Sequence, residues 1–104
     1  MAVELLITNM RNGTKQLVPV ATMDVYRTYW KPAISELQLQ IVPLLEDGLF
    51  TKSDIPEMLR ELDLIRGKFQ AMYTPDVSHA LAKRVDGAKA AFEAVLGNSE
   101  LDIS

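Results

Sequence analysis

The chain has 104 residues, with 11 lysines and arginines against 14 aspartates and glutamates, so its formal net charge is −3. This length fits one domain with a core large enough to fold without disulfides. The absence of cysteine excludes disulfides, thiolate catalysis and cysteine-ligated metal sites, and the single histidine, His79, gives little support to a metal cluster or a catalytic triad.

The charge pattern also narrows the classes of partner. No block of lysines and arginines is present, whereas a nucleic-acid binder usually carries a basic stripe. The N-terminal residues 1–8 lack a basic region, and their apolar run is too short for a signal peptide or a membrane span. We therefore expect a cytoplasmic protein with no nucleic-acid partner, no membrane association, no cofactor and no metal.

The first two elements are predicted to form a β-hairpin. Two β-prone runs, 3–10 and 15–22, flank Asn12-Gly13. This dipeptide suits a type I′ turn, because both central residues of that turn need positive φ. If Arg11 pairs with Thr14, five apolar side chains share one face: Val3, with Leu5 opposite Val20 and Ile7 opposite Val18.

A helix with a break at Pro32 is predicted next. Thr22 or Asp24 can cap it, and its apolar side chains recur at helical spacing: Tyr26, Trp30, Ala33 and Leu37. Pro32 removes one backbone hydrogen bond and its ring clashes with the preceding turn. The helix is therefore either kinked near Thr28 or split into two pieces, the second starting at Pro32.

A third short strand is predicted at residues 38–42, where apolar and polar residues alternate until Pro43. Pro19 cannot donate a hydrogen bond to a ladder. Its strand therefore lies at a sheet edge there, or its nitrogen points away from the neighbouring strand.

Two long helices complete the predicted fold. The first begins at Asp54, whose capping box places Glu57 at the third helical position, and it has an apolar stripe that extends to Met72. Thr74-Pro75-Asp76 starts the second helix, and Gly97-Asn98 ends it. The short link between them predicts an antiparallel helix pair.

The predicted fold class is therefore α+β. It comprises the N-terminal hairpin, a third short strand, one Pro-broken helix and the long C-terminal helix pair packed on the sheet. Residues 1–98 are expected to form a single domain, whose inner hairpin face meets the apolar stripes of both long helices. Residues 99–104 are expected to form a flexible acidic tail.

Two arginines are candidates for an anion site. On helical wheels, Arg66 falls inside the apolar arc of its helix and Arg84 at the edge of the next. Helix residues whose numbers sum to 148–150 should face each other, which brings these two side chains together. They can bind a phosphate or carboxylate with their guanidinium groups. Alternatively, each stem covers the core edge while its head reaches water or an internal acid, such as Asp24, Glu36 or Asp63.

Aromatic residues of the first helix are candidates for a partner surface. Tyr26 and Trp30 lie on its core face, so core packing is the ordinary interpretation of both. Tyr29 lies off that face and is the better surface anchor, because tyrosine is common at binding hot spots. The corner formed by Tyr29 and Trp30, next to Pro32, is therefore one candidate interface.

Further apolar residues exceed what the predicted elements can cover. Leu64 points away from the stripe of its helix, and Leu49 and Phe50 precede that helix in a loop. Leu6 and Leu17 lie on the outer face of the hairpin. This surplus is typical of a dimer or partner interface, although a patch without consequence explains it equally well. The acidic residues give little indication of acid–base chemistry, because Glu57 and Glu61 are expected to form a solvated pair on the exposed helix face.

These patterns leave several functions open. The leading hypothesis is a small non-enzymatic protein-binding module, such as an inhibitor, an immunity-like protein or an accessory subunit, whose partner is another protein or a second copy. No catalytic residues are assigned. The alternative is a small-anion or phosphate site, with or without enzymatic activity, organised around Arg66 and Arg84. A purely structural homo-oligomer is the third possibility.

Overall fold

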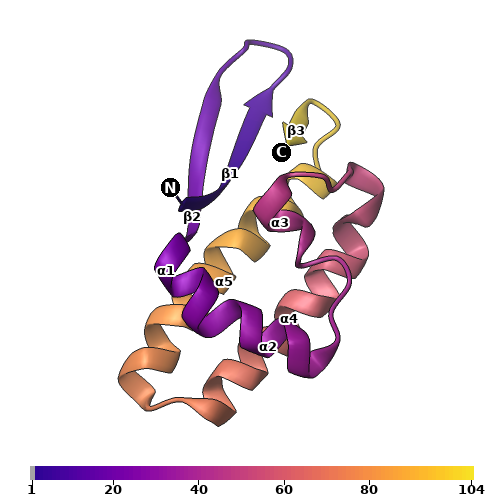
Figure 1. Ribbon diagram of the computed structural model, residues 1–104. Coiled ribbons are helices and arrows are strands. Elements are labelled where there is room, and N and C mark those ends of the chain that lie inside the picture. The colour runs from indigo at the N-terminus through magenta and orange to yellow at the C-terminus, as the bar shows by residue number, and fades with distance from the viewer. Residues whose placement is uncertain (1) are drawn as a thin grey trace.

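A three-stranded antiparallel sheet forms one side of the molecule. The computed structural model describes residues 2–104. The strands are β1 (Ala2–Asn9), β2 (Lys15–Thr22) and β3 (Leu101–Ile103), and their order is β2-β1-β3. The tip of the β1–β2 hairpin extends beyond the helices (Figure 1). β2 is an edge strand. Pro19, which has no N–H to donate, therefore lies at the sheet edge, as one of the two alternatives predicted.

Helices form the rest of the fold. In chain order they are α1 (Met23–Val25), the π-helical segment η1 (Tyr26–Trp30), α2 (Lys31–Leu37), α3 (Leu44–Asp47), the short 3₁₀ helix η2 (Lys52–Asp54), α4 (Ile55–Met72) and α5 (Pro75–Leu96). The predicted α+β class with a long C-terminal helix pair is confirmed.

The helix pair packs on the sheet through α5. This helix contacts all three strands, whereas α4 packs against α5 and α2 (Figure 1). The expectation that both apolar stripes meet the hairpin face is thus correct mainly for α5. Val3, Leu5 and Val20 of the sheet are buried in a core that also includes Phe69 of α4 and Phe92 of α5.

The hairpin turn is longer than predicted. The loop is closed by Asn9 and Thr14, with a 2.8 Å hydrogen bond from the Asn9 N–H to the Thr14 carbonyl. Gly13 has a φ of +74°, but Asn12 does not adopt positive φ, so a type I′ turn does not form. The Asn9 side-chain oxygen instead accepts the N–H groups of Arg11 and Asn12 at 3.0 and 3.4 Å. This local turn adds two residues to the loop.

The longer loop changes the register of the strands without changing their faces. Leu5 lies opposite Val18, and Ile7 lies opposite Gln16, so the predicted pairs are wrong by two residues. Because side chains alternate with a period of two, a shift of two keeps the same side chains on the inner face. The register shifts again between Val3 and Glu4, where β2 has one residue, Val20, more than β1.

Pro32 does not split the first helix. The chain stays helical from Met23 to Leu37, and Pro32 occupies the first turn of α2. The preceding turn widens into the π-helix η1, in which the Lys31 N–H reaches the carbonyl of Tyr26, five residues earlier. A π-turn omits a regular i→i−4 bond, so the missing N–H of proline is accommodated without a break.

Residues 38–42 do not form the predicted strand. α2 ends at Leu37, and the cap residue Gln38 adopts the left-handed conformation with a φ of +55°. Three consecutive N–H groups then donate to the carboxylate of Glu61 on α4, at 3.3, 2.9 and 2.9 Å, from Gln40, Ile41 and Val42 respectively. These backbone donors are therefore not free to pair with another strand.

The third strand lies instead in the segment that was predicted to be a flexible tail. Within residues 99–104, β3 pairs antiparallel with β1, with Ile7 opposite Ile103. The Lys52 ammonium also donates a 2.9 Å hydrogen bond to the carbonyl of Leu101. Ile103 is buried, so the C-terminal segment belongs to the folded sheet.

The capping of α4 also differs from its prediction. The capping box lies one turn earlier, around η2, where the Asp54 carboxylate accepts the Thr51 N–H at 2.8 Å. Asp54 precedes α4 but makes no side-chain cap to it, because its carboxylate is already engaged. Asp54 nevertheless occupies the N-cap position, so α4 starts at Ile55, directly after it, and the predicted start of α5 at Pro75 is confirmed.

Candidate functional site

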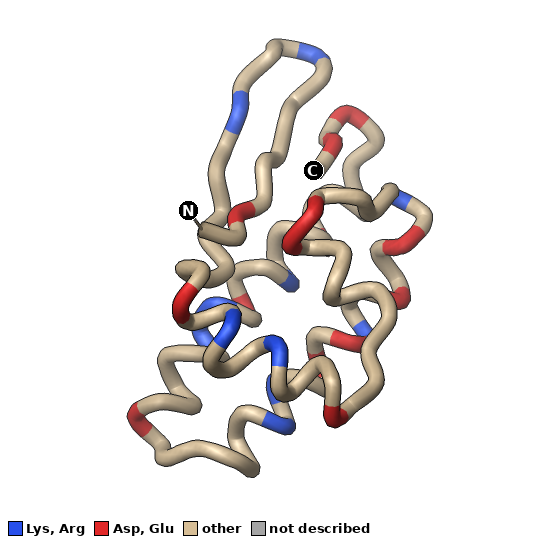
Figure 2. The backbone as a smooth tube through the Cα atoms, viewed as in Figure 1, with Lys and Arg blue, Asp and Glu red and all other residues tan. Residues whose placement is uncertain are grey.

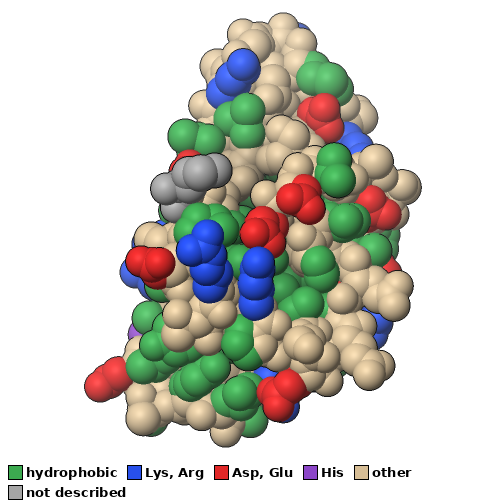
Figure 3. Space-filling view, viewed as in Figure 1, with side chains coloured by type: hydrophobic (Ala, Val, Ile, Leu, Met, Phe, Trp, Pro, Cys, Tyr) green, Lys and Arg blue, Asp and Glu red, His purple; other side chains and the backbone are tan. Residues whose placement is uncertain are grey.

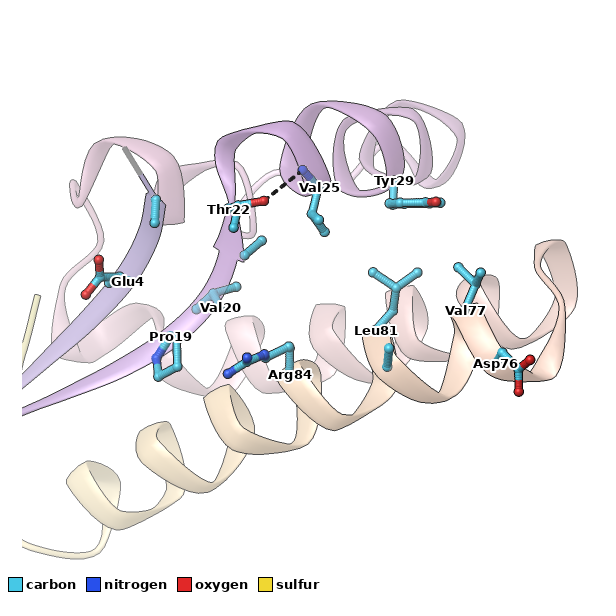
Figure 4. Close-up of a pocket in the computed structure, with 13 residues that line it drawn as sticks. Glu4, Pro19, Val20, Thr22, Val25, Tyr29, Asp76, Val77, Leu81 and Arg84 are labelled. Atoms are coloured by element: carbon cyan, nitrogen blue, oxygen red, sulfur yellow. Dashed lines mark hydrogen bonds between the residues drawn. The ribbon is translucent and has the colours of Figure 1, made fainter.

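An apolar groove of about 510 Å³ opens between β2, the first helix and α5. Val25 and Tyr29 project into it from one wall, and Val77 and Leu81 project from the facing helix α5 (Figure 4). Its lining also includes Pro19, Val20 and Ala21 of β2, and Ala80 of α5. Two helical walls with apolar side chains between them form a groove that is suited to an apolar segment of a partner.

Thr22 sets the position of the first wall. Its hydroxyl accepts the N–H of Val25 at 3.2 Å, so the helix begins where β2 ends (Figure 4). This contact identifies Thr22 as the cap among the two predicted candidates. One turn beyond Val25, the ring of Tyr29 packs edge-on against Tyr73, with centroids 5.0 Å apart. Tyr29, predicted as a surface anchor, is half-buried at the groove.

Three charged residues border the groove. Glu4 lies at one end, Asp76 at the other end, and Arg84 extends its side chain towards Pro19 (Figure 4). Among residues 2–104, no ion pair or side-chain hydrogen bond involves any of the three. The groove therefore presents its own charges to whatever binds there.

The structure does not bring Arg66 and Arg84 together. Arg66 lines a different, more polar cavity, together with Ser78 and His79. Its guanidinium binds both carboxylate oxygens of Asp86, at 2.9 and 3.2 Å, and this hydrogen bond raises the pKa of Arg66. The facing residues of α4 and α5 sum to 152 rather than 148–150, so Asp86 takes the place predicted for Arg84. The acid that meets Arg66 is thus none of the three suggested by the sequence.

Two of the predicted partner-surface residues are buried and cannot contact a partner. Trp30 is fully buried, stacked on Tyr26 at 6.0 Å and edge-on to Phe69 at 5.5 Å. Phe50 is buried against Phe92, because the loop before η2 folds inward. Leu64 is exposed on α4, as predicted. Other exposed apolar residues lie on separate elements, such as Leu17 on β2 and Leu96 at the end of α5.

Glu61 is the polar residue that the sequence interpretation placed wrongly. It was grouped with Glu57 on a solvated face, but only 3% of it is exposed. Its partners are the loop N–H groups of residues 40–42. On the α4 wheel Glu61 lies 40° from Ile65, which was the one available sign that it could border the core. Glu57 is exposed, and the hydrogen bond from Arg60 lowers its pKa.

Charged residues elsewhere do not gather into one docking face. Acidic and basic positions are scattered over most elements of the fold (Figure 2). On the face shown in Figure 3, apolar side chains are interspersed with charged ones. The net charge of −3 therefore does not define an acidic surface.

Tyr26 loses its proton at a higher pH than an ordinary tyrosine. Burial, with smaller contributions from Glu46 and Asp47, raises the pKa of Tyr26 from 10.0 to about 12. Above pH 10, the unfolded chain loses this proton while the folded chain keeps it. We expect the contribution of Tyr26 to be complete below pH 10 and to fall as the pH rises to about 12.

Urea unfolding at a series of alkaline pH values tests this expectation. Tyr26→Phe should reduce the alkaline loss of stability, because phenylalanine has no proton to lose. Tyr73→Phe controls for removal of one hydroxyl. An alkaline loss that is identical in wild type and Tyr26→Phe would contradict the assignment.

Neither a membrane span nor a metal cluster is found in residues 2–104. No helix there is long and apolar enough to cross a bilayer, and no three histidine, aspartate or glutamate side chains gather as metal ligands. Comparisons with protein-family models, curated proteins and solved structures find no match to the chain.

Proposed function

We propose that the protein is a non-enzymatic, cytoplasmic protein-binding module and that the groove between β2, η1 and α5 receives its partner. The observation that carries this proposal is the apolar lining of an open groove between two helical walls. An amphipathic helix binds such a groove through apolar side chains that recur every three or four residues.

The spacing of the groove residues favours a helical occupant. Val25 and Tyr29 are one helical turn apart on the first wall, and Val77 and Leu81 are one turn apart on α5. Side chains at this spacing form ridges along the i±4 rows, between which the ridges of another helix pack. The groove therefore matches the packing surface of a helix better than that of an extended strand.

Site-specific photo-crosslinking tests this function. A photoreactive amino acid at Ala80, in the groove, should yield covalent adducts with a partner protein in the cells that express the chain. The matched control is the same substitution at Ala90, which is also exposed on α5 but does not line the groove. Absence of a protein adduct at Ala80, or equal adducts at both positions, would contradict a protein-binding groove.

A further inference from the structure

We infer that the partner in the groove is a second copy of this chain, with the two α5 helices packed antiparallel about Ala80. This inference rests on the proposed function, because it names the occupant of the same groove. It follows from the order of charges on the groove side of α5.

The groove side of α5 carries an acid, a small residue and a base at equal intervals. Asp76, Ala80 and Arg84 are four residues apart, all three are exposed, and all three line the groove. At 100° per residue they span an arc of about 80°, so they face the same direction. Opposite charges thus lie two turns apart, roughly 12 Å along the helix, on either side of an alanine.

This arrangement is complementary to itself. In an antiparallel pair related by a two-fold axis at Ala80, residues whose numbers sum to 160 face each other. Asp76 of one copy therefore meets Arg84 of the second copy, and the same contact is repeated across the axis. A two-fold interface requires this kind of self-complementary surface.

The apolar residues fit the same arrangement. Alanine at the axis permits helix axes to approach to about 8 Å, the lower end of the usual range. Val77 of each copy would then lie between Ala80 and Arg84 of the other copy. Val25 and Tyr29 line the rest of the groove, opposite these α5 residues. The second helix would cover that part of the groove as well.

Two other charges on α5 are already paired within the chain. Asp86 binds Arg66, and Lys89 binds Asp63, both across the interface with α4. Within the described residues, Asp76 and Arg84 have no such partner. Lys83 and Glu93 are also unpaired among the described residues, but neither lines the groove. Asp76 and Arg84 are thus the two unpaired charges of α5 that a second copy in the groove would meet.

Sedimentation of the full chain over a concentration series tests the inference. Wild type should show a monomer–dimer equilibrium. Asp76→Arg and Arg84→Asp should each weaken the dimer at least 10-fold, because each substitution places two like-charge pairs across the axis. An equimolar mixture of the two variants should dimerise again, since one copy then carries two arginines and the other two aspartates.

Two variants with the same charge changes are the controls. Arg27→Asp and Glu93→Arg alter exposed residues outside the groove lining and should leave the dimer unchanged. Circular dichroism confirms that each variant is folded. A chain that is monomeric at all concentrations, a dimer insensitive to Asp76→Arg and Arg84→Asp, or a mixture that stays monomeric would each overturn the inference.

The two proposals fail separately. If crosslinking at Ala80 captures another protein and never a second copy, the groove binds protein but the dimer inference is wrong. If it captures no protein, the proposed function itself is wrong.

Discussion

Removal of residues 99–104 is expected to lower the free energy of unfolding by roughly 3–6 kcal/mol, because the deletion removes a buried side chain and several backbone hydrogen bonds. Leu6 and Ser104 exchange two such bonds, at 2.8 and 3.0 Å, and the Met10 N–H donates to Glu100 at 2.8 Å. Ile103 is only 6% exposed. β3 thus pairs with the edge of β1 that β2 leaves free, and it covers part of the core.

A point variant separates the packing of β3 from its hydrogen bonds. Ile103→Ala should cost about 2–4 kcal/mol, as expected for truncation of a buried isoleucine. Leu49→Ala removes the same number of carbon atoms from a side chain that is 69% exposed, and it should change stability by at most about 0.5 kcal/mol. Urea unfolding measures all three variants. Coincident transitions for the truncated chain and wild type would contradict the structural role of β3.

The fold class could be predicted from local pattern because each long element contains its own signal. The stripes of α4 and α5, with prolines in their first turns, specify two helices regardless of what packs against them. The error in the predicted turn did not change the predicted faces of the hairpin. The observed register differs by two residues, so Leu5 and Val20 are still on the inner face. Periodicity determines faces more reliably than it determines partners.

The two misplaced segments depend on distant residues. The alternating pattern at 38–42 suits a strand, but its N–H groups are taken by a glutamate about twenty residues later. The segment 101–103 is too short to show a period, and its partner, β1, is at the opposite end of the chain. Local propensity cannot reveal such pairings, because the deciding contact is tertiary.

The candidate site could be predicted only in part, because only some of its features depend on local spacing. Thr22 as a helix cap and Tyr29 as a surface-facing aromatic follow from local spacing. The separation of Arg66 from Arg84 required the true register of α4 against α5, which places Asp86 beside Arg66. The groove itself depends on how α5 lies across β2, which no single element encodes.

Replacement of Glu61 by alanine is expected to cost roughly 3–5 kcal/mol, because it leaves buried backbone donors without an acceptor. The carboxylate holds three consecutive N–H groups, and that of Val42 is buried. Each hydrogen bond to a charged group contributes about 1.5–3 kcal/mol, and an unsatisfied buried N–H is costly in itself. The loop that joins α2 to α3 should therefore loosen when Glu61 is removed.

Glu61→Gln distinguishes the hydrogen bonds from the bulk of the side chain. Its carbonyl can still accept from Ile41 and Val42, which share one carboxylate oxygen, but its amide group faces the N–H of Gln40 as a second donor. We expect a loss intermediate between wild type and Glu61→Ala. Glu57→Ala, one turn earlier on the exposed face of α4, is the control and should unfold close to wild type. Hydrogen exchange at Ile41 and Val42 should be slow in wild type and fast in Glu61→Ala, and equal protection in both would show that the loop is held by other contacts.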